Sequence, residues 1–291
     1  MQRVESSGVD TARLRGEARL LAEGGDVAGA ERLYRVAIDA GDAASPSRLA
    51  LLFEHAGRMS DAAALYRLAD ERGDALGALG LGAMLERENR PDDAERAYAR
   101  AGDRGVVEGD VHCGDLLVRR GDLAGAQVRF ARAHEQGDLV GTRALASVSG
   151  LMGDMARAES VWRDADLRED AEGACQYGLL LARRGDEAAA EQAYGRAEER
   201  GHSEAPNELA KLLDQRGEHE QAEAAVRRAD ERGSATGAYN LAVILKRRGE
   251  LDAAREAAQR AVERGYDLKR ADTALSRRIL PRRGGRKRTG N

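Results

Sequence analysis

The chain has 291 residues, of which 34% are charged and 3% are aromatic, and its formal charge at neutral pH is −4. No stretch approaches 18 consecutive apolar residues, which excludes a membrane-spanning helix, and residues 1–10 lack the apolar core of a secretory signal. The two cysteines, Cys113 and Cys175, cannot form a disulfide framework, so we expect a cytoplasmic protein. Arginine greatly outnumbers lysine, a composition that indicates a bacterial source.

After a polar N-terminal tail, residues 1–9, a glycine recurs every 16 positions through residues 10–266. Glycine adopts the left-handed backbone that ends a helix without steric cost, and asparagine is the next best choice. The positions form two interleaved series with steps of 32 residues: Gly25, Gly57, Asn89, Gly121, Gly153, Gly185, Gly217 and Gly249, then Gly41, Gly73, Gly105, Gly137, Glu169, Gly201, Gly233 and Gly265. The spacing predicts short helices that end at these positions, with Glu169 as the one real departure.

The helices between these stops are of two alternating kinds. Outer helices carry an alanine, usually an aromatic residue four positions later and an alanine three after that, whereas inner helices carry a large, a small and again a large residue. Examples are Ala62, Tyr66 and Ala69 of an outer helix and Leu49, Ala50 and Phe53 of an inner one. Each set lies on one helical face, which predicts helix pairs packed through those faces.

These patterns resemble the tetratricopeptide repeat, whose signature combines a large residue and a small one with Ala-x3-aromatic-x2-Ala. The interval of 32 residues differs from the usual 34, and the late proline of that family is absent. The pairs Gly73-Asp74 and Gly201-His202 are similar instead to the Sel1-like repeat. The resemblance covers about residues 10–265 and implies an all-helical, right-handed α-solenoid of about eight helix–turn–helix repeats.

Polar residues take apolar positions at both ends of the array. Glu17 stands where the next repeat has Leu49, and Thr273 and Arg277 occupy the two large-residue positions of the segment 267–279. Because terminal repeats must face water, this favours a capping helix over 267–279. Residues 280–291 are expected to be a disordered basic tail.

The repeat at residues 139–170 is the least regular. Ser149 replaces a core leucine, Gly150 falls late in a helix and Glu169 replaces the terminal glycine. A glycine inside a helix costs about 1 kcal/mol, so this repeat is either a hinge in the array or the product of simple drift.

No pattern indicates catalysis or a cofactor. The chain has no phosphate loop, no HExxH, no GxSxG and no paired-cysteine zinc motif. Gly77, Gly80 and Gly82 lie inside an inner helix, where helix packing explains them, and Trp162 occupies an outer-helix aromatic position of the core. The histidines lack the spacing of metal ligands, and both cysteines fall at or near core positions, so we expect no enzyme, no cofactor and no metal site.

The tetratricopeptide resemblance implies a concave groove lined by the inner helices, in which a peptide or protein partner binds. Transferred position by position, the groove residues are Arg143, Asn207, Lys211, Asn240, Lys246 and Arg247. Asn207, Lys211 and Asn240 provide amide and ammonium donors for an anion, so recognition of a terminal carboxylate is one interpretation and an ordinary solvated face is the other. The sequence therefore favours a non-catalytic interaction scaffold.

The C-terminal segment is strongly basic. Residues 269–291 hold nine basic residues and one acid, a net charge of +8, so the rest of the chain carries −12. Its candidate anion-binding residues are Arg277, Arg278, Arg282, Arg283, Arg286, Lys287 and Arg288. The alternative function is thus association with nucleic acid or an anionic surface, although the tail could also contact the acidic body or serve solubility alone.

Overall fold

The computed structural model describes residues 10–267, and every regular element in that range is an α-helix. The helices are α1 (Thr11–Glu23), α2 (Val27–Asp39), α3 (Ser45–His55), α4 (Met59–Glu71), α5 (Ala75–Arg87), α6 (Pro91–Asp103), α7 (Val107–Arg120), α8 (Leu123–Glu135), α9 (Leu139–Leu151), α10 (Met155–Leu167), α11 (Ala171–Arg184), α12 (Glu187–Glu199), α13 (Ala205–Gln215), α14 (His219–Glu231), α15 (Ala235–Arg247) and α16 (Leu251–Glu263). The predicted N-terminal tail 1–9 and basic tail 280–291 lie outside the described residues, as does all of the predicted capping helix except Asp267.

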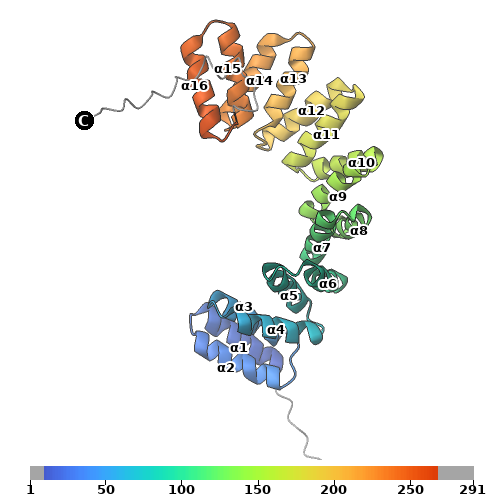
Figure 1. The fold of residues 1–291 in the computed structure, drawn as a ribbon, viewed down its shortest axis with the longest axis vertical. Helices are drawn as coiled ribbons and strands as arrows, with labels where there is room; N and C mark the ends of the chain where they lie inside the picture. The colour runs from blue at the N-terminus through green and yellow to red at the C-terminus, as the bar shows by residue number, and fades with distance from the viewer. Residues whose placement is uncertain (1–9, 268–291) are drawn as a thin grey trace, which may run out of the picture. The chain divides into compact units, whose positions relative to one another are not determined.

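The chain forms two compact units, Met1–Ala158 and Glu159–Asn291. Within each unit, helices that follow one another in sequence pack side by side as hairpins (Figure 1). Inner helices of successive repeats also touch: α3 contacts α5 and α7 contacts α9 in the first unit, and α11 contacts α13 in the second. The boundary falls inside the irregular repeat 139–170, whose role as a hinge stays a prediction.

The predicted helix stops are confirmed at all sixteen positions. The fourteen glycines have φ between 74° and 92°, and Asn89 and Glu169 share the left-handed region at 58° and 61°. In the described part of the chain no other residue has positive φ. The stop lets the next residue donate its N–H back into the helix, as when Asp26 donates to the carbonyl of Leu21 at 2.8 Å.

The core is formed by the helix faces that the repeat pattern predicted to pack together. Ala62 and Ala69 are fully buried, and the Tyr66 ring between them is 5% exposed. Glycine allows the inner helix to approach this ring, because a Cβ atom on Gly80 would collide with it. Trp162 is buried in the matching position of α10, as predicted.

Most inner helices begin with a side chain that accepts a hydrogen bond from the first turn. Asp74, Asp138 and Asp170 each accept from the N–H three residues on, at 3.1, 2.6 and 2.9 Å. Nδ1 of His202 does the same for the N–H of Ala205 at 3.1 Å. The Gly-Asp and Gly-His pairs are therefore helix caps, a role that the repeat pattern alone did not suggest.

Candidate functional site

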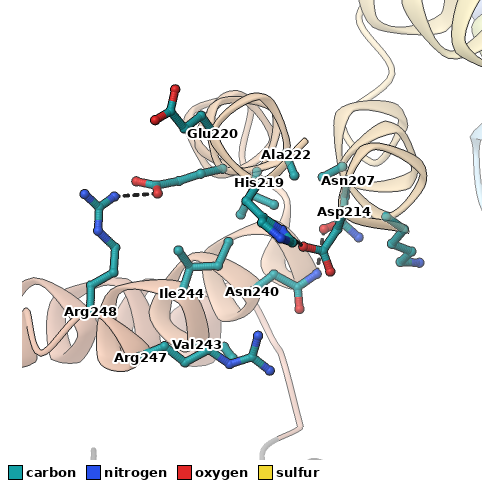
Figure 2. Close-up of a pocket in the computed structure, with 14 residues that line it drawn as sticks. Asn207, Asp214, His219, Glu220, Ala222, Asn240, Val243, Ile244, Arg247 and Arg248 are labelled. Carbon is teal, nitrogen blue, oxygen red and sulfur yellow. Dashed lines mark hydrogen bonds and ion pairs between the residues drawn. The ribbon is translucent and has the colours of Figure 1, made fainter. Parts of the chain in front are cut away.

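A pocket of about 540 Å³ lies between the last two repeats of the second unit, on α13, α14 and α15 (Figure 2). Its lining residues are Asn207, Ala210, Lys211, Asp214, His219, Glu220, Ala222, Glu223, Val226, Asn240, Val243, Ile244, Arg247 and Arg248. Four of the six predicted groove residues are among them, and the spacing of inner-helix positions is what brought these four together.

The other two predicted groove residues lie elsewhere. Lys246 is half-buried on α15 and is not part of the lining. Arg143 is exposed on α9, in the first unit. The basic tail residues 277–288 lie outside the described residues.

A pair of amides spans two repeats inside this pocket. Nδ2 of Asn240 donates to Oδ1 of Asn207 at 2.7 Å (Figure 2), and the Asn207 residue is only 1% exposed. Within residues 10–267, Nδ2 of Asn207 has no hydrogen-bond partner. Because this nitrogen is not among the fully buried side-chain atoms that lack a partner, it reaches the pocket surface and is an available donor for a ligand.

Three basic side chains of the rim already have acidic neighbours. Nζ of Lys211 lies 2.6 Å from Oε1 of Glu208. Nδ1 of His219 lies 2.8 Å from Oδ1 of Asp214, on the loop side of the pocket. Arg248 contacts Glu223.

Glu223 and Arg248 close one edge of the pocket with a contact of 2.5 Å between Oε2 and Nη1 (Figure 2). Hydrogen bonds from Arg227 and Arg248 outweigh the effect of burial and hold the pKa of Glu223 below its usual value. Arg247, one position earlier, is exposed and forms no ion pair or hydrogen bond within residues 10–267. The rim therefore offers one guanidinium without an anionic partner.

The side chains from α14 were missed by the sequence analysis, which considered only inner helices. His219, Glu220 and Val226 belong to an outer helix yet line the pocket. A comparison of the outer-helix positions across repeats gives a signal: Val226 stands where six earlier repeats have an aromatic residue.

Residues 10–267 hold neither a metal-binding cluster nor a membrane-spanning helix. No three His, Cys, Asp or Glu side chains in that range lie close enough to hold a metal ion. None of the described helices is both long and apolar enough to cross a bilayer.

No protein-family model matches the chain, and its sequence matches none of the curated proteins. Its structure is similar to that of a Sel1 repeat protein from Oxalobacter formigenes, with a TM-score of 0.68, 17% identity and coverage of 95% of this chain and 89% of the other. A protective antigen of uropathogenic Escherichia coli with an SLR fold gives 0.69 and 22% identity over 88% of this chain. The alignment spans only 62% of that antigen.

The C-terminal part of a TPR repeat-containing protein from Cytophaga hutchinsonii is also similar, with a TM-score of 0.56, 14% identity and coverage of 73% of this chain and 93% of the other. These likenesses show that the chain has the fold of Sel1-like and tetratricopeptide repeat proteins, as the sequence predicted. Repeat folds of this kind generally serve as protein-interaction scaffolds, through the extended surfaces that their stacked helices create.

Proposed function

We propose that this protein is a non-catalytic scaffold that binds a peptide or protein segment in the pocket on α13, α14 and α15. The observation that carries the proposal is that one pocket holds both an available amide donor, on Asn207, and a guanidinium without a partner within residues 10–267, on Arg247. A pocket of about 540 Å³ is within the range that holds a ligand, roughly 300–1,000 Å³.

The chemistry of the pocket suits a polypeptide. Val226, Val243 and Ile244 offer apolar walls for a side chain. The free amide donor of Asn207 can hold a backbone carbonyl oxygen, a group that every residue of a peptide carries. The site lies on helices rather than loops, so it is rigid before the partner binds, which lowers the entropic cost of association.

A displayed library of random peptides tests this proposal. The full chain is panned against the library, and each enriched peptide is titrated calorimetrically against the natural protein and the variants Arg247→Ala and Asn240→Ala. We expect both variants to weaken binding at least about tenfold, because Arg247→Ala removes the unpaired guanidinium and Asn240→Ala removes the hydrogen bond that positions Asn207.

Arg183→Ala is the matched control. Arg183 occupies the same inner-helix position two repeats earlier, is exposed on α11 and does not line the pocket. Affinity should be unchanged in this variant. If no peptide is enriched, or if Arg183→Ala weakens binding as much as Arg247→Ala does, the pocket is not the binding site.

A second candidate function rests on charge. The net +8 of residues 269–291 against −12 in the rest of the chain favours association of the C-terminal segment with nucleic acid or another anionic surface. We also expect a cytoplasmic, bacterial protein, on the arginine-rich composition and the two buried cysteines, which are unpaired.

A further inference from the structure

In two repeats of the first unit, an arginine, a glutamate and a tyrosine contact one another. They occupy the repeat positions that in the second unit belong to the pocket. Nη1 of Arg119 lies 2.7 Å from Oε1 of Glu86, and the hydroxyl of Tyr98 donates to Oε2 of Glu86 at 3.1 Å. One repeat earlier the same contacts, at 2.9 and 3.0 Å, join Arg87, Glu54 and Tyr66. In both repeats, a glutamate carboxylate thus pairs with an inner-helix arginine and accepts a hydrogen bond from a tyrosine hydroxyl.

The Tyr98 ring fills the space below this contact. It is 2% exposed and stacks on the His112 ring with centroids 5.0 Å apart. A Cβ atom on Gly82 would lie 2.5 Å from the nearest atom of the ring. The ring therefore occupies the gap between two successive inner helices, α5 and α7.

The repeat that holds the pocket in the second unit lacks this ring. Exactly four repeats, or 128 residues, after Tyr98 stands Val226, which has no aromatic group. The residues around it, in the positions of Gly82 and His112, are Ala210 and Asn240. All three line the 540 Å³ pocket, so the pocket includes the position that the Tyr98 ring fills in the first unit.

Arg247 also lacks the anionic partner that Arg119 has in the first unit. Arg247 corresponds to Arg119, but the position of Glu86 is taken by the shorter Asp214. Asp214 pairs instead with His219, at 2.8 Å. Arg247 consequently has no partner within residues 10–267.

The first unit has a hollow at the equivalent repeat positions, and its lining shows the effect of replacing Tyr98 by Val226 and Glu86 by Asp214. It measures about 490 Å³ and is lined by Glu86, Asn89, Pro91, Asp92, Glu95, Leu116, Arg119 and Arg120. Neither Tyr98 nor His112 lines it, because the arginine–glutamate pair and the ring close it. In the second unit the pocket continues past this point to Val226 and Asn207.

We propose that the pocket takes an aromatic side chain together with a neighbouring acidic side chain from an internal segment of a partner polypeptide. These are the two groups that Tyr98 and Glu86 supply in the first unit. The ring packs on Val226, and the carboxylate binds Arg247. This inference rests on the proposed function and specifies the partner.

Blocked dipeptides test the specificity directly by nuclear magnetic resonance. The probes are N-acetylated, C-amidated Tyr-Glu, Tyr-Gln and Ala-Glu, titrated into the full chain. We expect Tyr-Glu to bind about tenfold more tightly than either other dipeptide and to shift the side-chain signals of Arg247 and Asn207. Arg247→Ala should remove the preference for Glu over Gln, whereas Arg183→Ala should keep it.

Each alternative result has a definite meaning. Equal binding of Tyr-Gln overturns the role of the acid, and equal binding of Ala-Glu overturns the role of the ring. N-acetyl-tyrosine with a free terminal carboxylate is a further probe. If it binds as tightly as blocked Tyr-Glu, the anion comes from a chain terminus and the assignment to an internal acidic side chain is wrong.

Restoring the missing ring gives a second test. Val226→Tyr combined with Ala210→Gly and Asp214→Glu rebuilds the first-unit contact, since the Cβ atom of Ala210 would otherwise collide with the ring, as one on Gly82 would with Tyr98. We expect this triple variant to stay folded and to lose dipeptide binding by at least about tenfold. Val226→Phe combined with Ala210→Gly is the reserve variant should the triple variant not fold. Retained Tyr-Glu binding in a folded, ring-filled variant overturns the inference. Library peptides that need Arg247 but lack an aromatic–acidic pair would overturn this inference and leave the proposed function intact.

Discussion

Arg104 reaches from the end of one outer helix to Asp70 at the end of the outer helix before it, with 2.7 Å between Nη1 and Oδ1. Nη2 of Arg100 binds the other carboxylate oxygen at 2.5 Å, and Asp70 is only 8% exposed. We call this arrangement, one carboxylate bound by two arginines of the next outer helix, a clamp. The same clamp joins Asp166 to Arg196 and Arg200, Glu198 to Arg228 and Arg232, and Asp230 to Arg260 and Arg264. A buried carboxylate with two guanidinium partners thus links consecutive repeats.

Replacing Asp70 by Asn tests the contribution of one clamp. The change leaves Arg100 and Arg104 without their anion, and because the carboxylate is buried we expect a loss of about 1–3 kcal/mol in the free energy of unfolding. Urea denaturation followed by circular dichroism measures it. Asp61→Asn, on the same helix but in an exposed pair with Arg58, is the control and should have little effect. Equal effects of the two variants would contradict the clamp.

The clamps also predict how stability depends on pH. Burial raises the pKa of Asp70, but the hydrogen bonds from Arg100 and Arg104 outweigh it, so the pKa lies below its ordinary value. The same balance lowers the pKa of Asp166 and Asp230. A depressed pKa in the folded state stabilises the fold fully above the unfolded value of about 3.9, and this stability is lost as the pH falls through the folded pKa.

We therefore expect the urea midpoint to fall as the pH is lowered below about 4, with a shallower fall in Asp70→Asn, which has one titrating clamp fewer. Matched denaturation series of the natural protein and the variant check this. Parallel curves for the two proteins would show that Asp70 does not contribute to the acid sensitivity.

The fold could be predicted from the sequence because its determinants are local. A helix that ends in the left-handed conformation requires only a residue that tolerates positive φ. Such residues, for example Gly25 and Gly265, can be recognised directly in the sequence. Asn207 and Asn240 could be brought together for the same reason, since both follow from the inner-helix register.

The depth of the pocket could not be predicted from one helix type. It depends on what neighbouring side chains leave empty, here the missing ring at Val226 and the turn of Asp214 toward His219. The clamps were missed because their partners are 30 and 34 residues apart and are adjacent only across repeats. The recurrence of arginine at 32-residue steps, as in Arg196, Arg228 and Arg260, was nevertheless visible.

Glu169→Gly should stabilise the second unit by about 1 kcal/mol. Glu169 holds a φ of 61°, a left-handed conformation that costs an L-residue about 1–2 kcal/mol, and glycine avoids this cost while losing more chain entropy on folding. The reciprocal change at the same position of the next repeat, Gly201→Glu, should destabilise by a similar amount, since Gly201 has a φ of 91° and open space around it. Thermal unfolding of both variants measures the effects, and a shift of the same sign in both would exclude backbone strain as the cause.

Deleting residues 280–291 tests the second candidate function. The deletion removes four arginines and a lysine, so a chain that binds nucleic acid through this segment should lose its retention of DNA or RNA at low salt. Electrophoretic mobility shifts at two salt concentrations measure it. Absence of any shift with the full chain at low salt would eliminate this function.

In one clamp of the first unit the carboxylate comes from the following inner helix, α7, and not from the outer helix, α6. Gly102 stands where other repeats have Asp70, Asp166 or Asp230, and the fully buried Asp110 of α7 stands where these repeats have alanine. Oδ1 of Asp110 lies 3.0 Å from Nη1 of Arg129. A Cβ atom on Gly102 would collide with this carboxylate, so the two positions are mutually dependent.

A double-mutant cycle reveals this dependence. Asp110→Ala removes the buried anion of Arg129 and Arg132, which keep only the more exposed Asp103 as a partner. Gly102→Asp forces two carboxylates into one space, so each single change should cost about 2–3 kcal/mol. The double variant returns the carboxylate to the position that Asp70 has relative to Arg100, and it should regain most of the loss, with a coupling of about 3 kcal/mol. Urea unfolding of the four proteins provides the cycle. Additive losses would mean that Asp110 does not substitute for the missing acid at position 102.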